Sequence, residues 1–257
     1  MNQYLAEKID VAGVGLSNVS ITEVSDIFNH AIDDNRKIRV CITPANCIIW
    51  ANNDAYLKKI YNDADITLCD GVPVLWASKF LGTPLKERIT GLDLLPKYVK
   101  ECYDNGYSFF LLGAKDGVAF ALQKKLNAKY PGIKITGIYS PPFAEKFSEE
   151  ENLKMIQLVN AGKPNVLWVS LTAPKQDFWI AENLNKLDVN IAIGVGGAFE
   201  VTAGLIQRAP RFLQRMGLEW FFRFIREPKR LFKRYILEAP AFIPLVLKQK
   251  FSRKNVQ

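Results

Sequence analysis

Short apolar runs alternate along the chain with longer segments whose apolar residues recur at helical spacing. The short runs predict strands at 9–14, 38–43, 66–69, 108–112, 133–138, 166–171 and 189–195. The longer segments predict helices at 22–32, 46–61, 72–80, 92–104, 116–129, 148–161 and 175–187, followed by a helical tail. Strands that alternate with helices are typical of a parallel sheet with helices on both faces. We therefore expect an α/β fold with a Rossmann-like, mostly parallel sheet.

Small or polar residues follow five of the predicted strands at their carboxyl ends. They are 43–46 (Thr-Pro-Ala-Asn), 70–71 (Asp-Gly), 113–116 (Gly-Ala-Lys-Asp), 172–176 (Thr-Ala-Pro-Lys-Gln) and 194–197 (Gly-Val-Gly-Gly). The carboxyl ends of parallel strands share one edge of the sheet, and open α/β sheets bind ligands beyond that edge. The pattern predicts one shared site.

Asp70 is the first candidate for chemistry in this site. A carboxylate at a strand end can act as a general base when a nucleophilic hydroxyl lies within hydrogen-bond reach. The alternative is that Asp70 only caps the helix that begins near Val72. Position alone leaves both interpretations open.

The glycine-rich run Gly194-Val195-Gly196-Gly197 can offer backbone amides to a phosphate. It does not have the GxGxxG spacing of dinucleotide-binding folds, because Phe199 stands at the third glycine position. This departure disfavours a nicotinamide or flavin enzyme. The alternative for the run is a tight turn that serves only packing.

A metal site is not expected. Asp63-Ala64-Asp65 has the DxD pattern of metal-binding glycosyltransferases, but it begins a predicted strand and so lies opposite the proposed site. The four cysteines form no CxxC pair, and His30 is the only histidine. We expect the cysteines to be ordinary buried residues and the protein to need no metal or other cofactor.

Charge divides the chain into two parts. From position 205 onward there are 13 Lys or Arg and 3 acidic residues, whereas the first 204 residues carry 21 bases and 23 acids. We expect a nearly neutral body at 1–204 and a basic appendage at 205–257. An anionic partner fits the appendage: a membrane surface, a diphosphate or a nucleic acid.

Helical spacing over 218–236 separates arginines from aromatic residues. Arg223, Arg226, Arg230 and Arg234 form one stripe, and the opposite side carries Phe221, Phe224, Ile225, Pro228, Leu231, Phe232 and Tyr235. Such a helix can lie in a bilayer interface while its guanidinium groups bind phosphates. The alternative is a solvated charged face above a face that packs into a core. Pro228 is expected to kink or split the helix.

Two further features bear on location. The apolar segment 239–247 is too short to span a bilayer, which takes roughly 20 residues. Residues 1–10 contain Glu7, Lys8 and Asp10 and no apolar run, so no signal peptide is expected. We therefore expect a peripheral protein at the cytoplasmic face of the membrane.

Taken together and in this order, these motifs resemble the WecG/TagA/CpsF family of bacterial glycosyltransferases. The matching stretches are 43–46, 70–71, 87–93 (Glu-Arg-Ile-Thr-Gly-Leu-Asp), 110–113 (Phe-Leu-Leu-Gly), 174–176, 194–200, 208–211 (Arg-Ala-Pro-Arg), 217–220 (Gly-Leu-Glu-Trp) and 226–230 (Arg-Glu-Pro-Lys-Arg). The likeness covers nearly the whole chain.

The resemblance implies a Rossmann-like body with a C-terminal appendage that reaches the membrane. It implies inverting, metal-independent transfer of a sugar from a UDP donor to an undecaprenyl-diphosphate-linked sugar, in teichoic acid, capsule or exopolysaccharide synthesis. Donors within the family include N-acetylmannosamine, its uronic acid, glucose and galactose, and the sequence does not choose among them.

The resemblance also assigns roles to residues. Asp70 matches the proposed base. The family's active-site threonine, asparagine and glutamine match Thr43, Asn46 and Gln176, and its appendage arginines match Arg223 and Arg230 most closely. The further substrate-binding candidates are Arg88, Gly194, Gly196, Gly197, Glu200 and Arg226. Glu200 stands where aspartate is expected to hold the donor ribose, so its carboxylate lies about one methylene further out.

Two alternatives stay open. A nucleic-acid-binding protein could use the basic, aromatic tail, although arginines and aromatics on opposite faces fit a single-strand groove poorly. A soluble nucleotide-dependent enzyme could use the apolar face of the tail to form a homo-oligomer.

Overall fold

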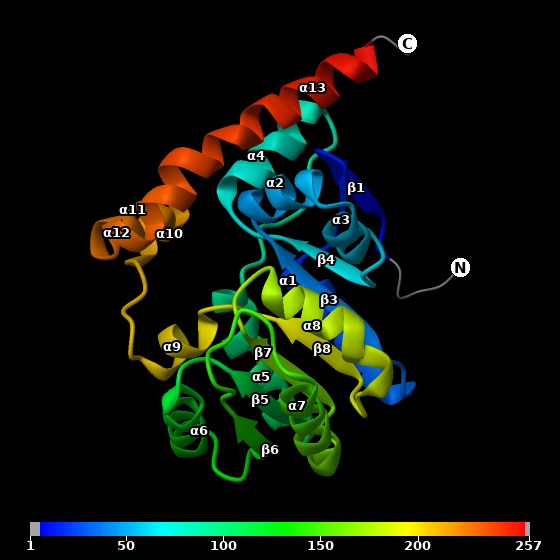
Figure 1. Ribbon diagram of the computed structural model, residues 1–257, viewed down its shortest axis with the longest axis vertical. Helices are drawn as coiled ribbons and strands as arrows, with labels where there is room; N and C mark the ends of the chain where they lie inside the picture. Colours follow the sequence, from blue (N-terminus) through cyan, green and yellow to red (C-terminus); the bar gives the residue numbers. More distant parts are fainter. Residues whose placement is uncertain (1–5, 255–257) are drawn as a thin grey trace.

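A computed structural model describes residues 6–254, apart from the side chains of Arg215, Arg230, Arg234, Arg253 and Lys254. Its centre is a sheet of six strands in the order β4-β3-β8-β7-β5-β6, and every pairing in it is parallel. The strands are β3 (Ile38–Thr43), β4 (Ile66–Cys69), β5 (Ser108–Gly113), β6 (Lys134–Tyr139), β7 (Val166–Ser170) and β8 (Ile191–Gly194). The predicted parallel α/β sheet is confirmed (Figure 1).

Helices cover both faces of the sheet because alternate strand residues point to opposite sides. Val40 and Ile42 join a core with α1 (Ile21–Asp33), α5 (Gly91–Asn105), α6 (Val118–Lys129) and α9 (Ala198–Ala203). Cys41 faces the other core, beneath α2 (Ala45–Asn53), α3 (Ala55–Asn62) and α4 (Val72–Leu81). Leu167 and Val169 pack on that face against α7 (Glu149–Gly162) and α8 (Lys175–Asn183).

The predicted strand 9–14 is wrong. The chain forms a hairpin there, in which β1 (Lys8–Val11) pairs antiparallel with β2 (Val14–Ser17) outside the main sheet. Ala12 and Gly13 turn the chain with φ of +53° and +81°. Positive φ at both central positions is the turn that suits the twist of a two-residue hairpin.

Two predicted helices are not continuous α-helices. The helix predicted over 46–61 is divided into α2 and α3 at Asp54, whose carboxylate accepts hydrogen bonds from the backbone N–H groups of Tyr56 and Leu57. The end of the helix predicted over 175–187 is a short 3₁₀ turn, η1 (Leu184–Lys186). The sequence also gave no prediction for α9, which follows the glycine-rich run.

The C-terminal segment begins at residue 205, and its described part, residues 205–254, contains a series of helices. They are α10 (Arg211–Arg215), α11 (Glu219–Arg226), α12 (Pro228–Phe232), the π-helical η2 (Lys233–Glu238), the 3₁₀ turn η3 (Ala239–Ala241) and α13 (Phe242–Lys254). Pro228 begins α12 and α11 ends at Arg226, so the predicted split at this proline is confirmed.

The last helix packs against the body. Phe242 and Val246 of α13 are buried in the same core as Val74 and Leu81 of α4. The side chain of Gln249 accepts a hydrogen bond from the backbone N–H of Ala12, with an N–O distance of 2.6 Å. Among residues 6–254, no helix is both long and apolar enough to cross a membrane.

Candidate active site

The candidate site residues follow neighbouring strands at the carboxyl edge of the sheet. Thr43 ends β3, Asp70 follows β4 and Gly194 ends β8. The backbone N–H of Asp70 lies 3.3 Å from the carbonyl oxygen of Thr43, and Val195 donates to the carbonyl oxygen of Val169 at 2.8 Å. The parallel register therefore brings these strand ends to one edge, as the sequence pattern indicated.

Asp70 is half-buried at the end of β4. The next residue, Gly71, occupies the N-cap position of α4 with φ of +93°. Burial raises the pKa of the neighbouring Cys69 thiol to about 12, and the charge of Asp70 adds to this shift while that of Arg88 opposes it.

Gln176 supports the glycine-rich turn from below. Its side-chain oxygen accepts a hydrogen bond from the backbone N–H of Gly196 at 3.0 Å, and the side chain is almost fully buried. A Cβ at Gly194 would lie 2.6 Å from the Gln176 amide carbon, so only glycine leaves room for this contact. Ser170 donates to the carbonyl oxygen of Gly196 at 2.6 Å. Gln176, expected to contact substrate, holds the shape of the turn in this structure.

A residue of the C-terminal segment reaches the same turn. A Cβ placed on Gly197 would lie 3.7 Å from Nη2 of Arg223 and 3.8 Å from Oε2 of Glu200. Glu200 lies in the first turn of α9, and its Oε2 is buried without a hydrogen-bond partner among the described residues. A buried carboxylate oxygen in this position is suited to accept a bond from a ligand hydroxyl.

Thr43 and Asn46 are buried at the end of β3 and in the first turn of α2. Thr43 is fully buried, and its hydroxyl has no hydrogen-bond partner within the described part of the chain. Asn46 is 5% exposed, and its amide nitrogen lies 3.9 Å from the sulfur of Cys47.

The other predicted arginines are not all gathered at the turn. Arg88 forms ion pairs with Asp93 at 3.6 Å and with Glu219 at 3.5 Å. Arg226 is exposed and donates to the side chain of Gln207 at 2.7 Å. The side chain of Arg230 lies outside the described part of the structure.

Arg88 belongs to a group of four charged residues. The sequence indicated Arg88 as a candidate but did not predict that these four side chains lie together. This junction cluster consists of Arg88, Asp93, Arg208 and Glu219. Burial lowers the pKa of Arg208, but its hydrogen bonds and charge interactions with Glu219 and Asp93 outweigh that effect and raise it. The members of the junction cluster lie in the stretches 87–93, 208–211 and 217–220. The match of these stretches to the family was the only sign of the cluster in the sequence.

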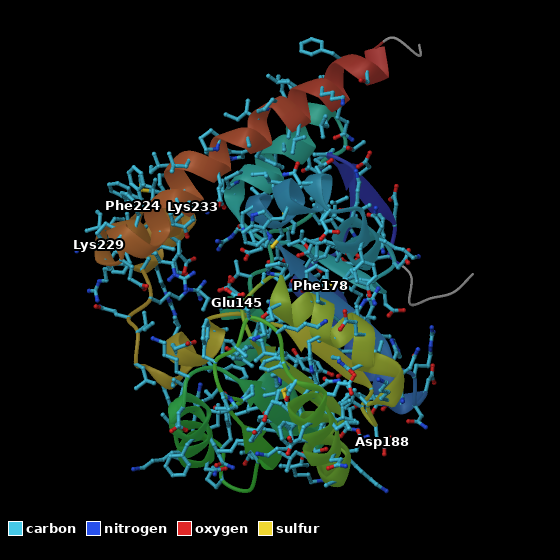
Figure 2. The ribbon with its side chains drawn as sticks, in the orientation of Figure 1. Glu145, Phe178, Asp188, Phe224, Lys229 and Lys233 are labelled. Carbon is cyan, nitrogen blue, oxygen red and sulfur yellow. The ribbon has the colours of Figure 1, made fainter. Side chains whose placement is uncertain are left out.

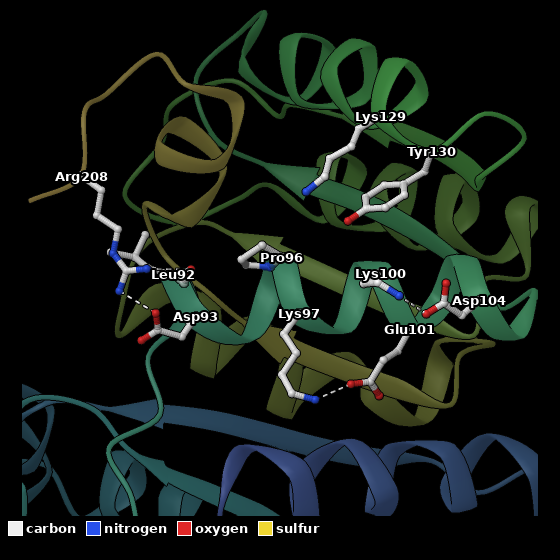
Figure 3. Close-up of a pocket in the computed structure, with 10 residues that line it drawn as sticks. All are labelled: Leu92, Asp93, Pro96, Lys97, Lys100, Glu101, Asp104, Lys129, Tyr130 and Arg208. Carbon is white, nitrogen blue, oxygen red and sulfur yellow. Dashed lines mark hydrogen bonds and ion pairs between the residues drawn. The ribbon is translucent and has the colours of Figure 1, made fainter. Parts of the chain in front are cut away.

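A shallow pocket of about 590 Å³ begins at this cluster and runs along α5 (Figure 3). Asp93 and Arg208 lie at one end, and Lys100, Asp104 and Tyr130 lie toward the other. The pocket is separate from the glycine-rich turn, and its charged side chains largely pair with one another.

The DxD pattern has structural roles at the opposite edge. Asp63 ends α3 and pairs with Lys59, and Asp65 accepts a hydrogen bond from the backbone N–H of Arg39 at 2.8 Å. Within residues 6–254, no three His, Cys, Asp or Glu side chains are grouped to hold a metal ion. All four cysteines are free and buried, as expected.

The apolar side of the C-terminal segment is largely exposed. Phe221, Ile225 and Phe232 are exposed, whereas Leu231 is buried. Figure 2 shows Phe224, Lys229 and Lys233 on the C-terminal helices and Asp188, which precedes β8, on the far side of the molecule. The core-packing alternative therefore fails for most of this face.

The carboxylate of Asp70 follows β4 at the sheet edge that also carries the glycine-rich turn, and Arg223 lies beside that turn. By its fold and by the family that it matches, the protein is a glycosyltransferase. The family model described as "Glycosyl transferase WecG/TagA/CpsF family" matches residues 9–256, and the chain belongs to this family.

Among its relatives are enzymes of Staphylococcus aureus strains MW2 and NCTC 8325 / PS 47. Both carry the name N-acetylglucosaminyldiphosphoundecaprenol N-acetyl-beta-D-mannosaminyltransferase. Each is 29% identical to this chain over 253 residues, which cover 97% of this chain and 96% of the relative.

Proposed function

We propose that this glycosyltransferase moves a sugar from a UDP donor to the sugar of an undecaprenyl-diphosphate-linked acceptor, without a metal ion. N-acetylmannosamine is the first candidate donor sugar, and N-acetylglucosaminyl-diphosphoundecaprenol is the first candidate acceptor. The names of the S. aureus relatives, which align over almost the full length, support both choices.

The main observation behind the proposal is that the Arg223 guanidinium group and the Glu200 carboxylate both lie close to Gly197. The N–H groups of the turn and the guanidinium group suit a diphosphate. The unpartnered Glu200 oxygen suits a ribose hydroxyl beside that diphosphate. Asp70 follows the strand at the edge of the same sheet, where an acceptor hydroxyl would approach the sugar.

In the proposed reaction, the acceptor hydroxyl oxygen attacks the anomeric carbon of the donor. Its proton passes to the Asp70 carboxylate, and the bond between the anomeric carbon and the UDP oxygen breaks. UDP leaves with the bonding electron pair, and Arg223 stabilises the charge that develops on its diphosphate. A single displacement of this kind turns an α-linked donor into a β-linked product.

We further propose that the acceptor is met at an anionic bilayer, on a surface formed by the C-terminal segment and α4. Trp76 and Phe80 of α4 are exposed at 63% and 49%, and Ile243, Leu247 and Phe251 are exposed at a spacing of four residues on α13. Lys250 of α13 joins the two helices, because its ammonium group donates to the carbonyl oxygen of Phe80. Exposed apolar residues beside an excess of basic residues suit an anionic interface.

The test is a donor screen with the full chain in detergent, with and without EDTA. The acceptor is N-acetylglucosaminyl-diphosphoundecaprenol, and the donors are UDP-activated N-acetylmannosamine, its uronic acid, glucose and galactose. We expect transfer from UDP-N-acetylmannosamine, a β-linked product and an unchanged rate in EDTA. Transfer from none of these donors would overturn the proposed substrates, and loss of the rate in EDTA would overturn metal independence.

A further inference from the structure

The junction cluster joins the body of the protein to its C-terminal segment. Arg88 and Asp93 belong to the body, since Arg88 precedes α5 and Asp93 lies in its first turn. Arg208 and Glu219 belong to the C-terminal segment, before α10 and at the start of α11. Two of the four ion pairs, Arg88 with Glu219 and Arg208 with Asp93, therefore bridge the two parts.

The cluster is a closed, charge-balanced ring. Arg208 contacts Asp93 at 2.7 Å and Glu219 at 2.9 Å, and Arg88 contacts the same two carboxylates at 3.6 and 3.5 Å. The side chains are between 11% and 31% exposed, so water screens them less than an ordinary surface pair. Figure 3 shows the contact between Arg208 and Asp93. Networks of this kind hold geometry better than isolated pairs do.

The ring is connected to Arg223 by one turn of helix. Glu219 and Arg223 are four residues apart in α11, so they lie on the same face of that helix. Fixing the Glu219 carboxylate fixes the start of α11, and this determines the position of the Arg223 guanidinium. That guanidinium lies beside Gly197.

The other side of the ring is connected to the glycine-rich turn. Asp93 follows Gly91, the first residue of α5, and a Cβ at Gly91 would lie 3.0 Å from the carbonyl oxygen of Val195. The hydroxyl of Thr90 donates to the carboxylate of Asp93 at 2.8 Å, which holds that carboxylate in place. The same four side chains are therefore linked to Arg223 through α11 and to the glycine-rich turn through the start of α5.

We propose that Arg88, Asp93, Arg208 and Glu219 are positioning residues, which hold Arg223 against the donor site. The inference rests on the proposed role of Arg223. It gives Arg88 a different task from the substrate contact expected from the sequence. Breaking the ring would leave Arg223 attached to a helix whose start is no longer fixed, without altering any group that touches the substrate.

The test is a double-mutant comparison with Arg208→Gln, Arg223→Gln and the two combined, measured as kcat and KM for the donor. Arg208→Gln is expected to lower kcat/KM by about 10- to 100-fold, the usual cost of misplacing a catalytic group by about 1 Å. In the Arg223→Gln background the same change should cost less than twofold, because the residue that it positions is already gone. If the ring had only a structural role, Arg208→Gln would lower kcat/KM by the same factor in both backgrounds.

Lys97→Gln is the matched control. It breaks an ion pair of similar exposure with Glu101 on α5, away from the C-terminal segment, and should leave kcat/KM within twofold. If Arg208→Gln does not fold, Arg208→Lys keeps the charge and should show a smaller loss that again disappears in the Arg223→Gln background. Equal losses in both backgrounds would overturn the positioning role, whereas full activity of Arg223→Gln alone would overturn the proposed role of Arg223.

Discussion

At the scale of single residues, the proposed site depends on two carboxylates, those of Asp70 and Glu200. Asp70 directly follows the buried strand β4, and the next residue, Gly71, occupies the N-cap position of α4. Glu200 keeps one carboxylate oxygen buried and unpartnered beside Arg223. The sequence indicated both residues by position or resemblance. It could not indicate that Gln176 is buried beneath the turn, because that depends on how β7 and β8 are paired.

Asp70→Asn should lower kcat by about 10²- to 10⁴-fold, because an amide cannot take the acceptor proton. UDP affinity should stay within twofold, since the proposed diphosphate contacts lie at Gly197 and Arg223. Steady-state transfer assays and calorimetric titration with UDP measure the two effects. Asp63→Asn, which alters an exposed carboxylate at the opposite edge, is the control and should retain turnover. Substantial turnover in Asp70→Asn would exclude Asp70 as the base.

Asp177 predicts a pH-dependent contribution to stability. Burial raises the pKa of its carboxyl to about 7, although the hydroxyl of Tyr61 donates to it at 3.1 Å and acts in the opposite direction. In the unfolded chain this group titrates near pH ~4, so between these values the folded state binds more protons. Stability from this group is therefore greatest at low pH and falls as pH rises toward 7.

Asp177→Asn removes that dependence. Relative to wild type, the variant should be more stable at pH 8 than at pH 5, by roughly a few kcal/mol. Urea unfolding of both proteins at the two pH values measures the difference. If the two proteins lost stability in parallel between these pH values, the buried carboxyl would not be the group that titrates.

At the scale of elements, the hydrophobic periodicity of the sequence predicted the main strands and helices. It did not predict the turns and helix caps that interrupt them. Apolar runs located the six strands of the sheet, and Pro228 correctly predicted a break in the C-terminal helix. The hairpin at Ala12-Gly13 and the break at Asp54 were missed, because each depends on a turn or a cap inside an otherwise continuous pattern. The junction cluster was missed because its members come together only after folding.

Gly194→Ala tests the turn as a unit. The added methyl group would lie 2.6 Å from the Gln176 amide carbon, so Gln176 must move and Gly196 loses its hydrogen-bond acceptor. We expect KM for the donor to rise about tenfold and stability to fall by about 1–3 kcal/mol. Gly15→Ala, whose new methyl group meets only side chains at 3.4 Å or more, should change neither. An unchanged donor KM in Gly194→Ala would mean that the turn does not hold the donor.

At the scale of the whole molecule, the C-terminal segment packs against the body and brings Arg223 close to the glycine-rich turn. Removing everything after Gln207 would also take Phe242 and Val246 out of a shared core. A truncated chain would therefore lose stability as well as Arg223. Point substitutions separate these two effects, so they suit tests of the membrane surface and of the site.

The proposed membrane surface predicts a loss of vesicle binding in Trp76→Ser/Phe80→Ser. Removing two exposed aromatics should weaken cosedimentation with phosphatidylglycerol-rich vesicles about tenfold or more. Phe120→Ser, which alters an equally exposed aromatic on α6 at the far end of the molecule, should have no effect (Figure 1). Equal vesicle binding by all three proteins would reject the surface. Loss of a dimer in the double variant would assign the surface to a second copy of the chain, and loss of oligonucleotide binding would assign it to a nucleic acid.

The central claim is that an arginine of the C-terminal segment completes the diphosphate site of the body. The most direct measurement is the calorimetric affinity of the full chain for UDP in Arg223→Gln and in Lys229→Gln, which removes an exposed charge from the neighbouring helix. Arg223→Gln should bind UDP about tenfold more weakly or worse, and Lys229→Gln should bind it as wild type does. If Arg223→Gln bound UDP with unchanged affinity, the C-terminal segment would play no part in holding the donor diphosphate.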